Sequence, residues 1–323
     1  MKRILSGYRP TGMIHLGNYF GSLVNWIRLQ SKYDCYFEVA DYHALTTYYQ
    51  HTDELPDYKV EMARDWLAAG LSHEKATIFI QSLVPEHAEL HVLLSMLVPV
   101  PWLERNPTVK EMIRDMNLQD NITYGLLGYP VLQAADILIY KAECVPVGQD
   151  QLPHVELARE IAKRFNHLYG KTFPVPEPML SQHPKVPGID GRKMSKSLQN
   201  AIFIRDTYKD IKRKVYQAFT DPKKIRLGDP GHPEGCVVFA YHNLVNKDEI
   251  DQIEADCKSG KLGCVECKKR CAHAIYEFLI PVRENLQNFT PERTKEILVE
   301  GSKRARKIAQ ATLEEVKEKM HLK

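Results

Sequence analysis

The chain has 323 residues, a net charge of +3 and 44% hydrophobic residues, values of a soluble globular protein with room for one or two cores. No apolar run is long enough to span a membrane, and a glycine and a proline come too early for a secretory signal. We therefore expect a cytoplasmic protein without a membrane partner. The weakly basic charge permits a polyanionic partner without requiring one.

Strand-like and helix-like patterns alternate along the first half of the chain. In order, we expect a strand at 3–7, a helix at 17–31, a strand running into a loop at 35–45, a helix at 53–70, a strand at 76–82 and a helix at 88–98. Such alternation predicts an α/β fold, a Rossmann-like parallel sheet with helices on both faces. Ligands of these sheets bind beyond the carboxyl ends of the strands.

A stretch rich in proline and glycine at 173–191 separates this half from a charged, largely helical remainder. We expect three parts: a catalytic domain over 1–204, a smaller α-helical domain over 205–290, and a final helix over 291–323. That last helix is expected to pack back on the first domain.

The first motif is "TGMIHLGNYFGSL" at residues 11–23. His15 and Asn18 are three residues apart, so at a helix start they share one face. Gly17 lets a ligand approach the backbone closely, and helix amino-terminal amides favour phosphate. A structural histidine is the alternative that this stretch alone leaves open.

The second motif is "GRKMSKSLQN" at residues 191–200. Lys193 and Lys196 can neutralise charge that builds on a pyrophosphate leaving group. A solvated basic helix start is the alternative. The sequence contains no G-x-x-x-x-G-K-[ST] phosphate loop, which makes a P-loop NTPase a poor fit.

"HLGN" and "KMSKS", in this order, resemble the two signatures of class I aminoacyl-tRNA synthetases. Asparagine at position 18, followed by Tyr19, is typical of the tryptophanyl branch. The segment 128–166 also resembles that branch. The resemblance implies catalytic roles for His15, Asn18, Lys193 and Lys196, and an anticodon-binding role for the helical domain.

Asp136 lies in the apolar run "VLQAADILIY", seven residues after Tyr129 and three after Gln133. A buried carboxylate needs donor partners, and an indole N–H is a donor only. The resemblance implies that tryptophan binds Asp136, Tyr129, Gln133, His43, Val147 and Gln151. A capping or ion-paired aspartate is one alternative. The same spacing also occurs in tyrosyl-tRNA synthetases, where the aspartate binds a phenol.

The resemblance further implies an ATP site with Mg²⁺ held largely by phosphates and water. Its residues are Arg9, Pro10, Thr11, Gly17, Asn18, Gly148, Gln149, Asp150, Val186, Lys193, Met194, Ser195, Lys196 and Ser197. Arg9 replaces a glutamine common in bacterial members, and an arginine can bind a phosphate more strongly.

Five of the seven cysteines fall within 236–271, and such clustering favours a metal over disulfides. Four thiolates can bind zinc or a [4Fe–4S] cluster. Some tryptophanyl enzymes carry a [4Fe–4S] cluster in this domain, and the resemblance implies the same here. The implied ligands are Cys236, Cys257, Cys264 and Cys267, with zinc as the alternative metal and Cys271 as an alternative ligand.

The resemblance implies an enzyme that activates L-tryptophan with ATP and transfers it to tRNA(Trp). It also implies a homodimer, for which the apolar segment 90–104 is a candidate interface. The alternatives are a tyrosyl-tRNA synthetase, a small-molecule nucleotidyltransferase, and a non-catalytic RNA-binding iron–sulfur protein derived from a synthetase.

Overall fold

The computed structural model describes residues 1–115, 121–180, 186–196 and 198–323. The chain forms two compact units. The first, here called the sheet unit, comprises 1–12, 25–182 and 289–323, and the second, the helical unit, comprises 13–24 and 183–288. The domains expected from the sequence divide the chain at 204 and 290 and stay a prediction, because compactness does not test what each part binds.

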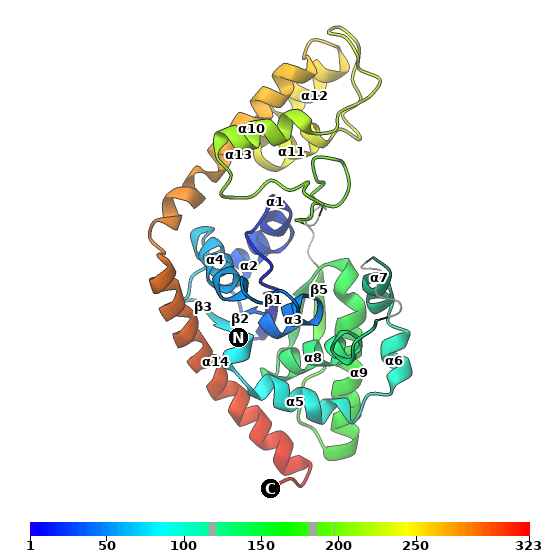
Figure 1. Ribbon diagram of the computed structural model, residues 1–323, viewed down its shortest axis with the longest axis vertical. Coiled ribbons are helices and arrows are strands. Elements are labelled where there is room, and N and C mark those ends of the chain that lie inside the picture. Colours follow the sequence, from blue (N-terminus) through cyan, green and yellow to red (C-terminus); the bar gives the residue numbers. More distant parts are fainter. Residues whose placement is uncertain (116–120, 181–185, 197) are drawn as a thin grey trace. The chain divides into compact units, whose positions relative to one another are not determined.

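The sheet unit is built on five parallel strands in the order β3-β2-β1-β4-β5, which confirms the expected α/β class (Figure 1). The strands are β1 (Arg3–Tyr8), β2 (Asp34–Val39), β3 (Ala76–Ile80), β4 (Cys144–Val147) and β5 (Glu177–Leu180). β2 and β3 are buried along most of their length, as strands covered on both faces are.

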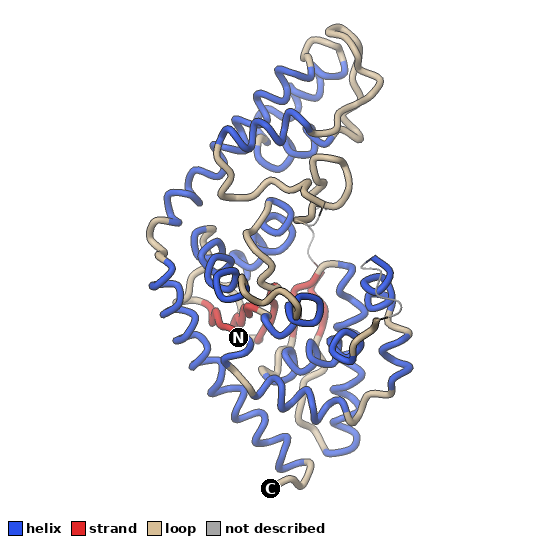
Figure 2. The backbone as a smooth tube through the Cα atoms, viewed as in Figure 1, coloured by secondary structure: helices blue, strands red, loops and turns tan. Residues whose placement is uncertain are grey.

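Helices surround these strands (Figure 2). They are α2 (Val24–Leu29), α3 (Asp41–Tyr48), α4 (Leu55–Ala68), α5 (Glu86–Ser95), α6 (Val100–Glu104), α7 (Pro107–Asp115), α8 (Tyr124–Ile139), α9 (Leu152–Tyr169) and α14 (Pro291–Lys319). None of the helices in the described ranges is both long and apolar enough to cross a bilayer.

The carboxyl-terminal helix α14 packs along β3 within the sheet unit (Figure 1). Gly301 makes this packing possible, because a Cβ atom there would lie 1.8 Å from the carbonyl oxygen of Ile78. Ser302 follows and donates its hydroxyl to the Leu298 carbonyl, while accepting from the Ile80 amide at 3.1 Å. Small residues thus let the helix approach the strand backbone directly.

Two elements differ from the sequence expectation. The segment after β2, expected as a loop, is the helix α3, whose Tyr42 amide donates to the Gln81 side chain at 3.0 Å. The proline-rich stretch expected as a domain exit contains β5, which pairs with β4 through Val145 and Pro178. A proline is tolerated there because β5 is an edge strand.

The helical unit combines a short amino-terminal segment with four longer helices. Its elements are α1 (Leu16–Asn18), a π-helical turn (Tyr19–Leu23), α10 (Tyr208–Gln217), α11 (Val237–Val245), α12 (Ile250–Lys258) and α13 (Cys264–Leu286). Phe278 of α13 stacks on Phe20 at 5.3 Å and meets Tyr19 edge-on at 5.7 Å. These ring contacts hold the first motif in the unit.

Candidate active site

Asp136 is fully buried on α8 and accepts three hydrogen bonds from protein side chains. His43 Nε2 donates to Oδ2 at 2.7 Å, and His87 Nδ1 donates to Oδ1 at 2.6 Å. Gln81 Nε2 also donates to Oδ1, at 2.9 Å. Burial opposes ionisation, but the hydrogen bonds from the two histidines outweigh it and hold the pKa of Asp136 well below its usual range.

Gln81 connects this carboxylate to helix α3. Its Nε2 donates to Asp136, while its Oε1 accepts from the backbone amides of Tyr42 and His43 at 3.0 and 3.4 Å. His87 continues the network, since its Nε2 lies 2.7 Å from the hydroxyl of Tyr140. The carboxylate is therefore fixed by groups from three separate segments. An ionised carboxylate has about four acceptor positions, so one remains, on Oδ2.

Tyr129 is also on α8 and is buried, and its hydroxyl lies 2.8 Å from His154 Nε2. Burial raises the pKa of Tyr129, against a smaller opposing effect of Arg9. Burial lowers the pKa of His154 to about 4, so this imidazole is neutral near pH 7. Tyr129 and His43 lie with their rings edge to face at 6.2 Å, in the same part of the sheet unit as Asp136.

Of the other predicted residues of the sheet unit, Gln133 lies on α8, and the rest lie near the ends of β1 and β4. Gln133 and Val147 are half-buried, as are Gln151 and Thr11, whereas Pro10 is buried. The burial of these residues does not by itself assign a ligand to any of them.

Gly148, Gln149 and Asp150 follow β4 and are exposed. A Cβ atom on Gly148 would lie 2.7 Å from Asp150 Oδ1, so the glycine leaves room for that carboxylate. Arg9 is also exposed, and its guanidinium approaches the Thr47 hydroxyl at 3.4 Å.

In the helical unit, His15 and Asn18 cap each other at the start of α1. The Asn18 amide donates to His15 Nδ1 at 3.2 Å, and the His15 amide donates to Asn18 Oδ1 at 3.4 Å. Burial lowers the pKa of His15 to about 4, with smaller contributions from Lys196 and Lys193. The imidazole is therefore neutral, with Nδ1 as acceptor and the proton on Nε2.

The structure brings the two motifs together within this unit. The amide of Gly17 points at Met194 Sδ at 3.4 Å, and His15 forms an isolated antiparallel bridge with Phe203. The amides of Leu16 and Ile204 extend this contact through the carbonyls of Ile202 and Ile14, at 2.9 and 3.1 Å. The start of α1 and the second motif, residues 191–200, here called the lysine loop, therefore form one folded element.

Asn200 shapes the lysine loop. Its Oδ1 accepts from the Ser195 amide at 2.8 Å, and its Nδ2 donates to the Lys193 carbonyl at 3.1 Å and to Asp190 Oδ1 at 2.8 Å. Gly188 makes room for it, since a Cβ there would lie 2.2 Å from Asn200 Nδ2. Val186, just before, is buried. The predicted Ser197 lies outside the described residues.

Comparison with known proteins identifies the family. Residues 1–280 match the model of the class I tRNA synthetases (W and Y). The chain is 45% identical to the tryptophan–tRNA ligase of Aquifex aeolicus, over 99% of this chain and 100% of that one. It is 47% identical to the tryptophan–tRNA ligase of Thermotoga maritima, over 99% of both chains. The chain belongs to the tryptophanyl branch of the class I tRNA synthetases.

A solved structure of the same branch has the same fold. The tryptophanyl-tRNA synthetase of Campylobacter jejuni, complexed with ADP and tryptophan, superposes with a TM-score of 0.89 at 34% identity, covering 99% of each chain. The tyrosyl alternative left open by the spacing of Tyr129 and Asp136 is thereby resolved in favour of the tryptophanyl branch.

The cysteines of this tryptophanyl chain gather in the helical unit. Cys236, Cys257, Cys264 and Cys267 line one pocket between α11, α12 and the start of α13, here called the cysteine pocket. Cys271 is not among the described residues that line this pocket. It is fully buried deeper in α13, with Sγ 3.7 Å from the Val238 carbonyl. Burial raises the pKa of Cys267 to about 12 and raises those of Cys257 and Cys264.

Three polar residues of these sites were missed by sequence reasoning: Gln81, His87 and Asn200. Gln81 directly follows β3 and His87 lies in the first turn of α5, about fifty residues before Asp136, so no local pattern joins them to it. Asn200 ends the quoted motif "KMSKSLQN", and its position just after the lysine loop was the available signal.

Proposed function

We propose that this chain ligates tryptophan to tRNA in two ATP-dependent steps. The carboxylate of tryptophan attacks the α-phosphate of ATP, which forms tryptophanyl-adenylate and releases pyrophosphate. A terminal ribose hydroxyl of tRNA(Trp) then takes the aminoacyl group and AMP leaves. The observation that carries this proposal is the pairing of His15 and Asn18 with the lysine loop inside a chain of the tryptophanyl branch.

Neither step uses a protein nucleophile, so positioning and electrostatic stabilisation provide the catalysis. In the helical unit, neutral His15 offers its Nε2 proton to a phosphate oxygen, and Asn18 orients it through the mutual cap. Lys193 and Lys196 neutralise the leaving pyrophosphate, with Ser195 and Met194 in the same loop. Mg²⁺ accompanies ATP and is held mainly by its phosphates.

In the sheet unit, Asp136 selects the amino acid. An amino acid without a ring donor would leave a buried acceptor unpaired, which is how sites of this kind reject analogues. Tyr129, Gln133, His43, Val147 and Gln151 are proposed to surround the same substrate. Arg9, Pro10, Thr11, Gly148, Gln149 and Asp150 are proposed to contact ATP.

The cysteine pocket fits a cysteine-bound metal centre, and we propose a [4Fe–4S] cluster held by Cys236, Cys257, Cys264 and Cys267. In the described part of the chain, no three of these sulfurs lie mutually within 4.8 Å. A tetrahedral zinc site would bring its sulfurs to about 3.8 Å of one another. The choice of the cluster over zinc rests on the resemblance to cluster-carrying members, and the cluster would cross-link the ends of α11, α12 and α13.

We also propose a homodimer that uses the segment 90–104. Val92, Met96 and Val100 on this segment are 50%, 72% and 53% exposed, an apolar surface that a second copy would cover. The expectation of a cytoplasmic location stays a prediction.

Pyrophosphate exchange into ATP tests the proposed function. Exchange that depends on tryptophan and is at least a hundredfold slower with tyrosine is the expected result. Exchange with tyrosine at a comparable rate would contradict the choice of amino acid. Absence of exchange with either, despite binding of RNA, would instead favour a non-catalytic protein derived from a synthetase.

A further inference from the structure

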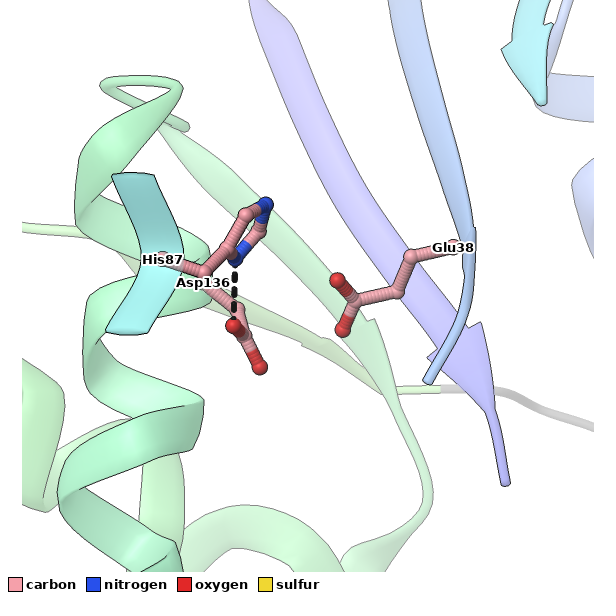
Figure 3. A group of neighbouring side chains, drawn as sticks. All are labelled: Glu38, His87 and Asp136. Carbon is pink, nitrogen blue, oxygen red and sulfur yellow. Dashed lines mark hydrogen bonds and ion pairs between the residues drawn. The ribbon is translucent and has the colours of Figure 1, made fainter. Parts of the chain in front are cut away.

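The hydroxyl of Tyr129 is held from a second helix. Tyr129 lies on α8, seven residues before Asp136, and His154 lies in the first turn of α9 and is fully buried. Their rings meet edge to face at 5.0 Å, and His154 Nε2 lies 2.8 Å from the Tyr129 hydroxyl. Asp136 is likewise held by an imidazole from another helix, His87 of α5, which Figure 3 shows together with Glu38 of β2. Both residues of α8 therefore have a histidine partner.

Asn106 determines which nitrogen of His154 carries the proton. It is buried just before α7, and its Oδ1 accepts from the amides of Thr108 and Val109 at 3.0 and 3.4 Å. This cap of α7 turns the Nδ2 atom of Asn106 toward His154 Nδ1, at 3.4 Å. An amide nitrogen is a donor only, so Nδ1 accepts and the proton of the neutral ring is on Nε2. His154 therefore donates to the hydroxyl oxygen of Tyr129.

The donated N–H fixes the hydroxyl and leaves it able to bind a ligand. The Tyr129 hydroxyl keeps its own proton and its remaining acceptor capacity. Tyr129 also lines a cavity of about 360 Å³ between α3 and α8, so a ligand can reach this residue.

The polarity of His154 needs an explanation, because burial of a polar ring has a cost in free energy. An apolar side chain at this position could pack against the tyrosine ring without that cost. It could not hold the hydroxyl, which would lose its partner. The imidazole is therefore explained by the hydroxyl that it holds.

We propose that His154 is a positioning residue of the reaction, whose Nε2 proton holds the hydroxyl of Tyr129 where this tyrosine meets tryptophan. The proposal rests on the proposed function, in which Tyr129 is one of the residues around the substrate. It adds that the tyrosine depends on a chain of side chains that runs from Asn106 through His154 and joins the segment before α7 to α9 and α8.

The test is a double-mutant cycle in pyrophosphate exchange. His154→Leu removes the N–H that Tyr129 accepts, so its KM for tryptophan should rise about fivefold while its KM for ATP stays within about twofold of wild type. His154→Gln keeps an amide donor at the place of Nε2, so its KM for tryptophan should stay within about twofold. In a Tyr129→Phe background, which has no hydroxyl to hold, His154→Leu should change the KM for tryptophan by less than about twofold.

Nitrogen NMR of isotope-labelled histidine tests the tautomer directly. The signals of His154 are assigned by their loss in His154→Gln. Near pH 7 they should show a protonated Nε2 and an unprotonated Nδ1, because Asn106 donates to Nδ1.

Four results would overturn the proposal. The first is an unchanged KM for tryptophan in His154→Leu, and the second is an unchanged KM in Tyr129→Phe. The third is an equal effect of His154→Leu with and without the tyrosine hydroxyl, which would mean that His154 only packs. The fourth is a proton on Nδ1. If His154→Leu does not fold, His154→Met replaces it. Wild-type exchange is measured first, because its absence would refute the proposed function itself.

Discussion

His15 and Asn18 hold each other in place at the start of α1, through the Asn18 amide on His15 Nδ1 and the His15 amide on Asn18 Oδ1. This mutual cap fixes the tautomer of His15 and directs its remaining N–H away from the helix backbone. Asparagine at position 18 therefore has a structural task in addition to any contact with ATP.

Asn18→Ala removes one half of the cap. The Asn18 backbone amide still donates to His15 Nδ1, and only the bond from the His15 amide to Asn18 Oδ1 is lost. We expect kcat of tryptophan-dependent pyrophosphate exchange to fall about tenfold, because the helix start that positions His15 is weakened. The KM for tryptophan should stay within twofold. Asn288→Ala, an exposed asparagine of the same unit, is the matched control. An Asn18→Ala enzyme with wild-type kcat would show that the cap has no catalytic role.

Lys196→Ala tests the stabilisation of the leaving group. Adenylate formation should slow at least tenfold, because one positive charge on the lysine loop is lost while pyrophosphate departs. Tryptophan affinity, measured by calorimetry, should not change. Lys209→Ala on α10 is the control, since this lysine is exposed and outside the loop. Exchange at the wild-type rate in Lys196→Ala would refute the assignment.

Asn200→Ala tests the support of the same loop. The change removes the bonds to the Ser195 amide and the Lys193 carbonyl, so we expect kcat to fall about tenfold and the thermal midpoint to fall by about a few degrees, because buried polar groups lose their partner. The control is Gln199→Asn, because Gln199 has a φ of 51°, which asparagine tolerates. Equal effects of the two changes would contradict a special role of Asn200.

Most of the parallel sheet was predictable from the sequence, whereas helix α3 and the edge strand β5 were not. β1, β2 and β3 are short apolar runs between helical patterns, a signal contained in each segment alone. The start of α3 is capped by Gln81, which lies 39 residues after Tyr42, so the local sequence gives no helix signal. Pro178 hides the strand β5, which a proline can enter only because the strand is at the edge.

The candidate site was also only partly predictable from the sequence. Burial of Asp136 followed from the apolar run around it. Its donors His87 and Gln81 were not predictable, because they lie at the start of α5 and just after β3, far from Asp136 in the sequence. Burial of the Asp136 carboxylate does not by itself require a donor from a ligand, since the protein itself supplies three donors.

Substitution of single cysteines tests the metal centre. Protein purified without oxygen should be brown, with broad absorption at about 400 nm, and should contain iron and sulfide. Cys264→Ser should remove the colour. Cys271→Ala should keep it, because Cys271 does not line the cysteine pocket. A colourless wild-type protein with one zinc would contradict the cluster, and loss of colour in Cys271→Ala alone would contradict the ligand set.

His154 makes the stability of the sheet unit depend on pH. Its pKa is about 4 in the folded chain and about 6.5 when unfolded, so the unfolded state binds more protons between these values. The free energy of unfolding should therefore fall as pH drops from 7 to 5, with about 2 kcal/mol due to His154. Urea titrations of His154→Gln should show a correspondingly smaller loss. An identical loss in wild type and variant would refute this contribution.

The central claim is that this chain activates tryptophan with Asp136 as the residue that selects the ring. The most direct measurement is kcat/KM for tryptophan in pyrophosphate exchange by wild type and Asp136→Asn, which preserves the size of the side chain. We predict a fall of at least a hundredfold for tryptophan, with the KM for ATP within threefold of wild type. An Asp136→Asn enzyme with wild-type kcat/KM for tryptophan would contradict the account.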